Sequence, residues 1–354
     1  MNDSEYATPN LSGRLEEFTR EIPKVELHLH LEGAIPLPTL LTLVQRAGRE
    51  QSIRTLDDLR RKLTYTDFAH FIDVYGWKNT FLAEEKDFAE IGYQVLRDLS
   101  RQNVKYVEAF YAPGDFRRQA LSVQGITENL IEGKERAFRD FGIRSELIVD
   151  LVRDHGPDTG MRRVEEVTPY LGQGVVGIGL GGSEQEFPAD PYALVYAEAR
   201  KRGFRLTAHA GEVAGADSVW TVIEKLGVER IGHGIRAEED PELMSVLERR
   251  RIPLEMCITS NLMTGVCQSI DAHPVKRYFQ HGLMVTVNSD DPTMFGTSIS
   301  QEYRILVQKL GFTVSELWQL NLNGIDASFM PDEEKELMKS EFEKQWQRVV
   351  SKYC

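Results

Sequence analysis

The sequence predicts an α/β fold, a (β/α)8 or TIM-type barrel in which eight parallel strands alternate with helices. Eight short apolar runs alternate with longer amphipathic stretches along the chain. Several of these stretches end in a glycine just before the next run. Histidine and carboxylate side chains gather at the C-terminal ends of the runs, which lie at one face of a barrel. A doubly wound open sheet is the alternative, and the count of eight runs favours the barrel.

The predicted strands are short runs rich in Val, Ile, Leu and Phe. They cover residues 24–31, 104–110, 144–151, 174–180, 204–210, 229–234, 252–257 and 283–290. From about residue 100 onward the runs recur at intervals of ~30–40 residues, which is the length of a strand, a helix and their loops. The regular spacing supports one repeated strand–helix unit.

The stretches between these runs predict helices. Residues 130–142, 191–203 and 217–227 place apolar side chains at three- and four-residue spacing, the period of one helix face. Glycines stand directly before the next strand at Gly142, Gly203, Gly227 and Gly282. Glycine accepts the left-handed conformation that ends a helix, so we expect these helices to stop there.

One interval is too long for a single helix. Residues 32–103 separate the first two strands and contain several amphipathic segments, so we expect extra helices that cover the mouth of the barrel. Their aromatic residues (Phe68, Phe71, Tyr75 and Trp77) favour a lid, and a surface insertion is the alternative. No linker or low-complexity tract divides the chain, so residues 1–354 are expected to form one domain.

The composition limits the classes of binding partner. Lys and Arg number 42 against 55 Asp and Glu, giving a net charge of −13, which disfavours nucleic acid and anionic membranes. No stretch reaches the ~20 apolar residues of a membrane helix. The three cysteines cannot make a disulfide framework, and the polar start of the chain lacks the features of a signal peptide. We therefore expect a cytoplasmic protein that binds a small molecule; its oligomeric state is not indicated.

Four ligand-type residues at strand ends predict a metal centre. His28 and His30 are two apart on a strand, so their side chains share a face ~6–7 Å apart. His209 and Asp290 end two other predicted strands. Three imidazole nitrogens and one carboxylate suit Zn²⁺ and leave a position open for water, as in catalytic sites. A pair of exposed histidines is the alternative for His28 and His30. The run GLGGSE (179–184) offers no lysine to bridge a second ion, so one Zn²⁺ per chain is expected.

Three further residues near these ends predict acid–base chemistry. Glu212 follows His209 by three residues and is interpreted as a proton shuttle, with a helix start as the alternative. His233 lies between two glycines and is interpreted as a base or electrostatic helper for the attacking water, with a core histidine as the alternative. Asp291 is interpreted as a carboxylate held by a proton donor on the substrate, with the start of a turn or a helix cap as the alternative. Glu108 and Asp150 have no assigned role, nor do four histidines outside this group: His70, His155, His273 and His281.

Other metal and nucleotide motifs are missing from the sequence. It has no HExxH zincin motif, no Walker loop and no GxGxxG after a strand. The HxE…PCxxC signature of cytidine-type zinc deaminases is also missing.

Four ordered motifs carry a resemblance to a known family. They are PKVELHLHLEGA (23–34), TAHAGE (207–212), IGHG (231–234) and VNSDDP (287–292). From about residue 22 to 330, the chain resembles the adenosine deaminase family of the amidohydrolase superfamily. The resemblance implies a zinc-containing barrel that deaminates 6-aminopurines hydrolytically. It implies zinc on His28, His30, His209 and Asp290.

The same resemblance implies roles around the purine. Glu212 would protonate N1, and His233 would orient and help deprotonate the attacking water. Gly182 would offer its backbone N–H to N3, and Asp291 would hold N7. We count Glu212, His233 and Asp290 as catalytic, and expect His30, Glu32, Gly182 and Asp291 to contact substrate.

Two departures from the family pattern concern the substrate. Glu32 stands where many adenosine deaminases have an aspartate that contacts the ribose, and Gly179 stands where the fourth strand often has an aspartate. The expected reaction is conversion of adenosine to inosine and ammonia. Adenine and 6-amino-6-deoxyfutalosine are the alternative substrates. Another mononuclear metal hydrolase or a non-catalytic binding barrel is a remote alternative.

Overall fold

The computed structural model describes residues 13–66 and 68–353, without the side chains at 68, 69 and 117. The side chain of Phe68, one of the predicted lid aromatics, therefore lies outside the described part.

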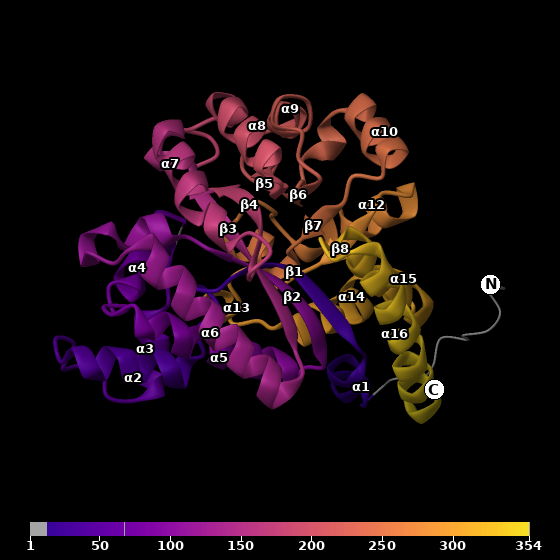
Figure 1. Cartoon of the computed structure of the whole chain (residues 1–354). Coiled ribbons are helices and arrows are strands. Elements are labelled where there is room, and N and C mark those ends of the chain that lie inside the picture. Colours follow the sequence, from indigo (N-terminus) through magenta and orange to yellow (C-terminus); the bar gives the residue numbers. More distant parts are fainter. Residues whose placement is uncertain (1–12, 67, 354) are drawn as a thin grey trace.

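Eight parallel strands form the centre of the molecule, with helices around them (Figure 1). They are β1 (Lys24–His30), β2 (Val104–Tyr111), β3 (Arg144–Val152), β4 (Val175–Gly181), β5 (Arg205–Ala210), β6 (Arg230–His233), β7 (Leu254–Met256) and β8 (Val285–Val287). Each strand pairs with the next one along the chain. A bridge between Leu29 and Asp290 joins the two edges, through Asp290 N–H to His28 O and His30 N–H to Asp290 O, each at 3.0 Å. The predicted (β/α)8 barrel is confirmed.

The last three strands are shorter than predicted. Residues 288–290 lie beyond the end of β8, where Asn288 Oδ1 accepts the backbone N–H groups of Leu27 and His28. His233 and Asp290 end their segments in the left-handed region, at φ of 62° and 63°. An apolar run does not reveal where a strand bends out of its ladder, so the predicted ends were too long.

Sixteen helices are described. They are α1 (Leu15–Glu21), α2 (Leu37–Ala47), α3 (Leu56–Lys62), α4 (Phe68–Asn79), α5 (Lys86–Ser100), α6 (Val123–Phe141), α7 (Pro157–Val167), α8 (Ala193–Arg202), α9 (Ala216–Thr221), α10 (Pro241–Arg250), α11 (Ile258–Met263), α12 (Val275–His281), α13 (Pro292–Phe295), α14 (Ile299–Leu310), α15 (Val314–Ala327) and α16 (Asp332–Tyr353). Gly142, Gly203 and Gly282 cap α6, α8 and α12 with positive φ, as predicted. Gly227 caps a wider π-type turn (Val222–Leu226) that continues α9. None of the described helices has the length and apolar character needed to cross a bilayer.

Helices α2 to α5 fill the long interval between β1 and β2, and α4 reaches the mouth of the barrel. Phe71 of α4 stacks on Phe295 of α13, with ring centroids 5.2 Å apart, and α13 follows the strand-end carboxylates directly. Lys78 of the same helix donates to the backbone oxygen of Glu32 at 2.6 Å. Trp77 instead packs on Phe81 inside the insertion. The extra helices therefore cover the mouth, but not with every predicted aromatic.

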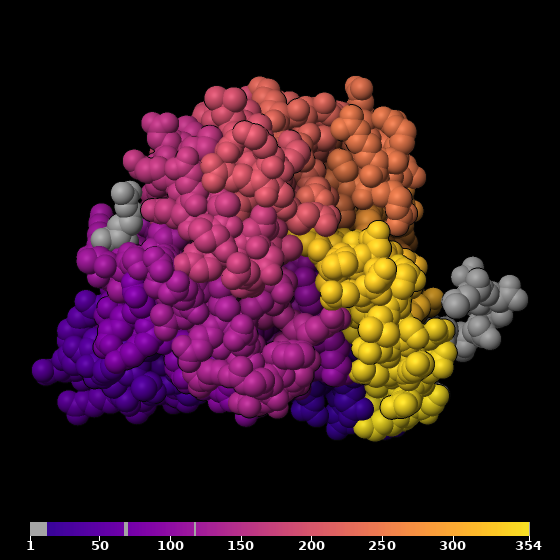
Figure 2. All heavy atoms as spheres, in the orientation of Figure 1, coloured from indigo at the N-terminus to yellow at the C-terminus, as the bar shows by residue number. Residues whose placement is uncertain are grey.

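The C-terminal helices close the opposite end of the barrel. Asn323 of α15 donates to the backbone oxygen of Val285 at the start of β8. Gly324 lies against Val25 of β1, where a Cβ would come within 2.4 Å of the valine side chain. Figure 2 shows this C-terminal segment, in yellow, packed against the rest of the chain. The end of the barrel at which the strands begin is therefore closed, and the open end is the face to which the strand C-termini point.

Candidate active site

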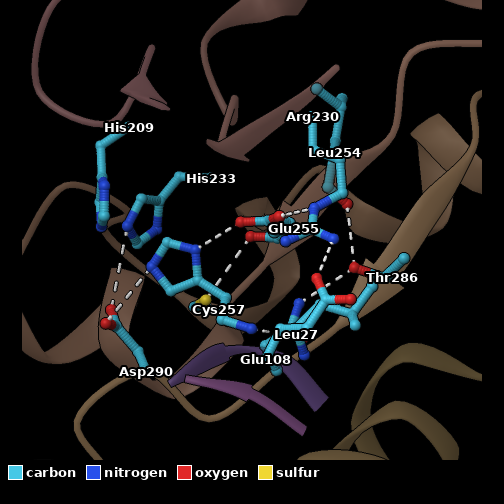
Figure 3. A network of polar contacts seen from close by, with 12 residues as sticks. Leu27, Glu108, His209, Arg230, His233, Leu254, Glu255, Cys257, Thr286 and Asp290 are labelled. Carbon is cyan, nitrogen blue, oxygen red and sulfur yellow. Dashed lines mark hydrogen bonds and ion pairs between the residues drawn. The ribbon is translucent and has the colours of Figure 1, made fainter. Parts of the chain in front are cut away.

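The four ligand-type residues converge at the mouth of the barrel. His30 Nε2 lies 3.1 Å from His209 Nε2 and 3.4 Å from Asp290 Oδ1. His28 Nε2 lies 3.6 Å from the same carboxylate oxygen. They come from β1, from β5 and from the turn after β8. Figure 3 shows His209, His233 and Asp290 grouped at one end of the polar network.

Hydrogen bonds orient two of these rings. His28 Nδ1 lies 2.7 Å from Glu255 Oε2, and His209 Nδ1 lies 3.1 Å from the backbone oxygen of Leu180. Since both partners can only accept, each Nδ1 carries a hydrogen and each neutral ring has its lone pair on Nε2. His28 Nε2 is buried and has no hydrogen-bond partner among the described residues. A buried nitrogen without a hydrogen-bond partner, facing a carboxylate and two other imidazoles, fits a site for a divalent cation.

The charges of the cluster fit the same ion. Burial lowers the pKa of His30 to about 4 and that of His209 well below its usual range, so both rings are neutral. Burial acts against protonation of His28 as well, but Asp290 and Glu255 raise its pKa to about 10. Without a metal, His28 thus holds a proton between two carboxylates. A bound cation would displace that proton.

Two of the residues with positive φ at this site are not glycines. His233 and Asp290 both adopt the left-handed conformation, which costs roughly 1–3 kcal/mol at a non-glycine residue. The pairing of β1 with the turn after β8 holds Asp290 in place. Such strain is typical of functional positions, because the surrounding fold must overcome it.

Glu212 lies beside the cluster, as predicted. Its Oε2 is 3.6 Å from His233 Nε2. Burial, followed by the charges of Asp290 and Glu184, raises the pKa of Glu212 to about 8. A carboxyl group in this state carries a proton near neutrality and can give it to a bound molecule.

Glu184 holds the loop that carries Glu212, and sequence reasoning did not single it out. Its carboxylate accepts from four successive backbone N–H groups, those of residues 211 to 214, at 2.6 to 3.1 Å. It also accepts from the hydroxyl of Ser218 at 2.5 Å. The only sequence signal was its place at the end of the fourth run. The loop that carries Glu212 therefore takes its shape from a buried carboxylate on the neighbouring strand end.

Asp291 lies at the same mouth, next to Gly33. Its Oδ1 is buried and has no hydrogen-bond partner among the described residues. A Cβ at position 33 would lie 1.6 Å from that oxygen, so only glycine lets the carboxyl lie there. Burial and the neighbouring Asp290 raise the pKa of Asp291 well above its usual range. A protonated Asp291 can donate a hydrogen bond to a ligand.

The remaining predicted contacts surround this mouth. Glu32 is buried, its Oε1 accepts from Ala112 N–H at 3.0 Å, and burial raises its pKa to about 7. Gly182 has a φ of 93° at the exposed end of β4. A side chain at Gly179 would come within 2.7 Å of Phe110, which explains why no aspartate stands there. Asp150 of β3 lies against Gly179 and Gly181 of β4, and burial raises the pKa of Asp150 to about 7.

A buried ion network supports His28 from below (Figure 3). Arg230 Nε donates to Glu255 Oε1 at 2.6 Å, and its Nη1 donates to Glu108. Glu108 also accepts from Tyr106 OH and from the backbone N–H of Phe329. All three charged groups are buried. Glu108 is thus part of the support below the site and does not reach the mouth. Sequence reasoning missed Glu255 and Arg230, because single charges inside short strands carry no distinctive pattern.

Comparisons with known proteins identify the family of the chain. A family model described as adenosine deaminase matches residues 23–345. Adenosine deaminase from Aliivibrio fischeri is 31% identical over 325 residues, covering 90% of this chain and 97% of that protein. Adenine deaminase from Wolinella succinogenes is 32% identical over 321 residues, covering 91% and 97%.

Solved structures give the same result. Adenine deaminase from Arthrobacter aurescens superposes with a TM-score of 0.87 at 30% identity, covering 91% of this chain and 98% of that one. An amidohydrolase from Burkholderia ambifaria, solved with bound Zn, has a TM-score of 0.88 at 28% identity, covering 98% and 99%. Arabidopsis ADAL complexed with IMP has a TM-score of 0.83 at 26% identity, covering 94% and 99%.

Proposed function

The chain belongs to the adenosine deaminase family of C–N bond hydrolases, and from this premise we propose that it deaminates a 6-aminopurine nucleoside hydrolytically, using one zinc ion. The product pair would be inosine and ammonia when the substrate is adenosine. The observation that carries the proposal is the convergence of three imidazoles and Asp290 beside a mostly buried Glu212, whose pKa is raised to about 8. A metal centre and a proton donor in one pocket suit addition of water to an aromatic C=N bond.

His28, His30, His209 and Asp290 would hold the zinc ion. When bound, zinc would lower the pKa of a water molecule towards ~7 and so supply a nucleophile at neutral pH. The Burkholderia relative with bound Zn supports the choice of ion. The four residues come from β1, from β5 and from the turn after β8 in a barrel with its own large core, so the fold is expected to persist without metal.

The chain's own residues would then bind the purine and move protons. Glu212 would give its proton to N1, which removes aromaticity and makes C6 electrophilic. Asp291, protonated in its buried position, would donate to N7. The N–H of Gly182 would donate to N3. As the tetrahedral adduct collapses, the proton of the added hydroxyl group passes to the amino group, C6 becomes a carbonyl, and the C6–N bond breaks to release ammonia.

The group at purine N9 would point towards the mouth, where His30 and Glu32 lie beneath the α4 lid. Adenosine is the proposed substrate. Adenine is the second candidate, because the Wolinella and Arthrobacter relatives of that name are as similar to this chain as the adenosine deaminase from Aliivibrio. The carboxylate of Glu32 would disfavour a 5′-phosphate, since like charges in a closed pocket cost several kcal/mol.

The test is a substrate panel. Zinc-loaded protein is incubated with adenosine, adenine, AMP and 6-amino-6-deoxyfutalosine, and ammonia release and the ultraviolet shift of the purine are followed. We expect the highest kcat/KM with adenosine and the lowest with AMP. A preference for adenine or AMP would contradict the argument about N9. No ammonia from any of the four would contradict the proposed function.

A second expected result concerns the loop that carries Glu212. Glu184→Gln replaces one accepting oxygen by an amide that faces backbone donors, so the loop should shift and Glu212 should lose its position. Second-sphere changes of this kind cost roughly 10–100-fold in activity. We expect that loss in kcat with unchanged zinc content. Glu186→Gln, an exposed neighbour, is the matched control and should behave as wild type. Full activity in Glu184→Gln would show that the carboxylate does not position the loop.

A further inference from the structure

A buried chain of hydrogen bonds leads away from His233 on the side opposite the metal ligands. His233 Nδ1 lies 3.1 Å from Asn261 Nδ2, and Asn261 Oδ1 lies 3.2 Å from His273 Nε2. The three side chains are 0–1% exposed. They come from the end of β6, from α11 and from the segment before α12. Neither Asn261 nor His273 has a part in the proposed reaction.

The far end of the chain fixes the direction of every bond in it. The backbone N–H of Val275 donates to His273 Nδ1 at 3.3 Å. A backbone N–H can only donate, so His273 Nδ1 carries a lone pair. Burial lowers the pKa of His273 to about 3, so the ring is neutral and its single N–H hydrogen is on Nε2. That hydrogen points at Asn261.

The amide of Asn261 is oriented as a consequence. Its oxygen must face the Nε2–H of His273, so its NH2 group must face His233. The reversed amide would set two donors against each other at His273. Because Asn261 donates, His233 Nδ1 carries a lone pair, and the hydrogen of the neutral ring is on Nε2.

The groups around His233 Nε2 agree with this tautomer. Glu212 Oε2 lies at 3.6 Å and Asp290 Oδ2 at 3.9 Å, and both are oxygen atoms that can accept. His233 also lies close enough to His28 and Asp290 to form an alternative metal-binding group. A ring with hydrogen on Nε2 cannot offer that nitrogen to a metal. The tautomer therefore separates His233 from the ligand set.

We propose that Asn261 and His273 are positioning residues that hold neutral His233 with its hydrogen on Nε2. In this state His233 donates a hydrogen bond to the oxygen of the attacking water and does not act as its base. The role at the water rests on the proposed function; the tautomer does not. A donor at this place stabilises negative charge that develops on the oxygen during attack. The sequence left open whether His233 acts as a base or as an electrostatic helper for the attacking water, and the proposal selects the second role.

The tautomer is tested directly by nitrogen NMR. Protein labelled with ¹⁵N-histidine is examined metal-free and zinc-loaded, and signals are assigned with His233→Gln and His273→Gln. Two-bond correlations from the ring protons identify the protonated nitrogen. We expect both rings to be neutral with hydrogen on Nε2. Hydrogen on Nδ1 of His233 would overturn the proposal. This result does not depend on any substrate, so it is separate from failure of the proposed function.

The role of the donor is tested by two variants of Asn261, assayed with zinc at pH 7.5, which is above the ordinary histidine pKa of ~6.5 and below the pKa of about 8 at Glu212. Asn261→Asp offers only hydrogen-bond acceptors to His233 and so draws the ring hydrogen to Nδ1. Asn261→Leu forms no hydrogen bond with the ring and so favours neither nitrogen as the site of that hydrogen. The wrong tautomer of the triad histidine costs a serine protease about 10⁴ in kcat. We expect kcat at least 100-fold below wild type in Asn261→Asp, with KM and zinc content unchanged, and a smaller loss in Asn261→Leu.

If His233 acts as a base, the order reverses, because a carboxylate on Nδ1 makes Nε2 more basic. Equal or higher kcat in Asn261→Asp than in Asn261→Leu would therefore overturn the proposal. Should Asn261→Leu fail to fold, His273→Phe and His273→Gln replace it. Phenylalanine releases the amide of Asn261, whereas glutamine can still donate to its oxygen. We expect the glutamine variant to keep the higher kcat, and the opposite order would contradict the proposal.

Discussion

Glu212→Gln is expected to lower kcat by at least ~10²–10⁴-fold, the usual contribution of a general acid–base group. The amide has nearly the shape of the carboxyl group but cannot deliver a proton to purine N1. Burial raises the pKa of Glu212 to about 8, so the wild-type side chain is held in the protonated state that this step requires. Zinc content and substrate binding should be unchanged.

The measurement is steady-state ammonia release together with metal analysis of each preparation. Glu242→Gln, an exposed glutamate on α10, is the matched control and should retain wild-type kcat. A Glu212→Gln enzyme within tenfold of wild type would remove Glu212 from the mechanism.

Asp290→Asn and Asp291→Asn should separate the roles of two adjacent carboxyl groups. Asp290 lies 3.4 Å from His30 Nε2 and 3.6 Å from His28 Nε2, so its loss should weaken zinc binding. Because a catalytic metal contributes several kcal/mol, activity should fall by ~10³-fold or more. Asp291→Asn should keep zinc, because its unpartnered oxygen lies against Gly33, and should lose kcat/KM through weaker contact with N7.

Competition with a chelator gives the zinc affinity of each variant, and thermal unfolding checks the fold. Equal zinc affinity in Asp290→Asn and wild type would exclude Asp290 as a ligand. Loss of zinc in Asp291→Asn would show that the second carboxyl group takes part in the metal site.

The barrel could be predicted because its signal is local and repeated. Each apolar run and each capping glycine marks one strand or one helix end, as at Gly142 and Gly203. The convergence of His28, His209 and Asp290 followed from the fold alone, since strand C-termini meet at one face. Strand ends were less predictable: just past the end of β8, the side chain of Asn288 accepts from the backbone of Leu27, 261 residues away in the sequence.

The supporting residues could not be found from the sequence. Glu184 acts through backbone N–H groups of another strand end, and Glu255 acts through a ring from across the barrel. Neither contact follows a fixed separation in the sequence from which it could be predicted. His273 stood outside every motif, and its position is set by an amide on another helix. The lid was predicted as a unit, but Trp77 turned inward because Phe81 and Glu50 of the insertion bind it there.

The central claim is that one metal ion, held at the ends of the strands, drives the deamination. Titration of metal-free protein with zinc, followed by ammonia release from adenosine, tests it most directly. We expect no activity without metal, a linear rise on addition of zinc and a plateau at one equivalent per chain, with the fold unchanged throughout. Activity in fully metal-free protein, or a plateau only at two equivalents, would contradict the account.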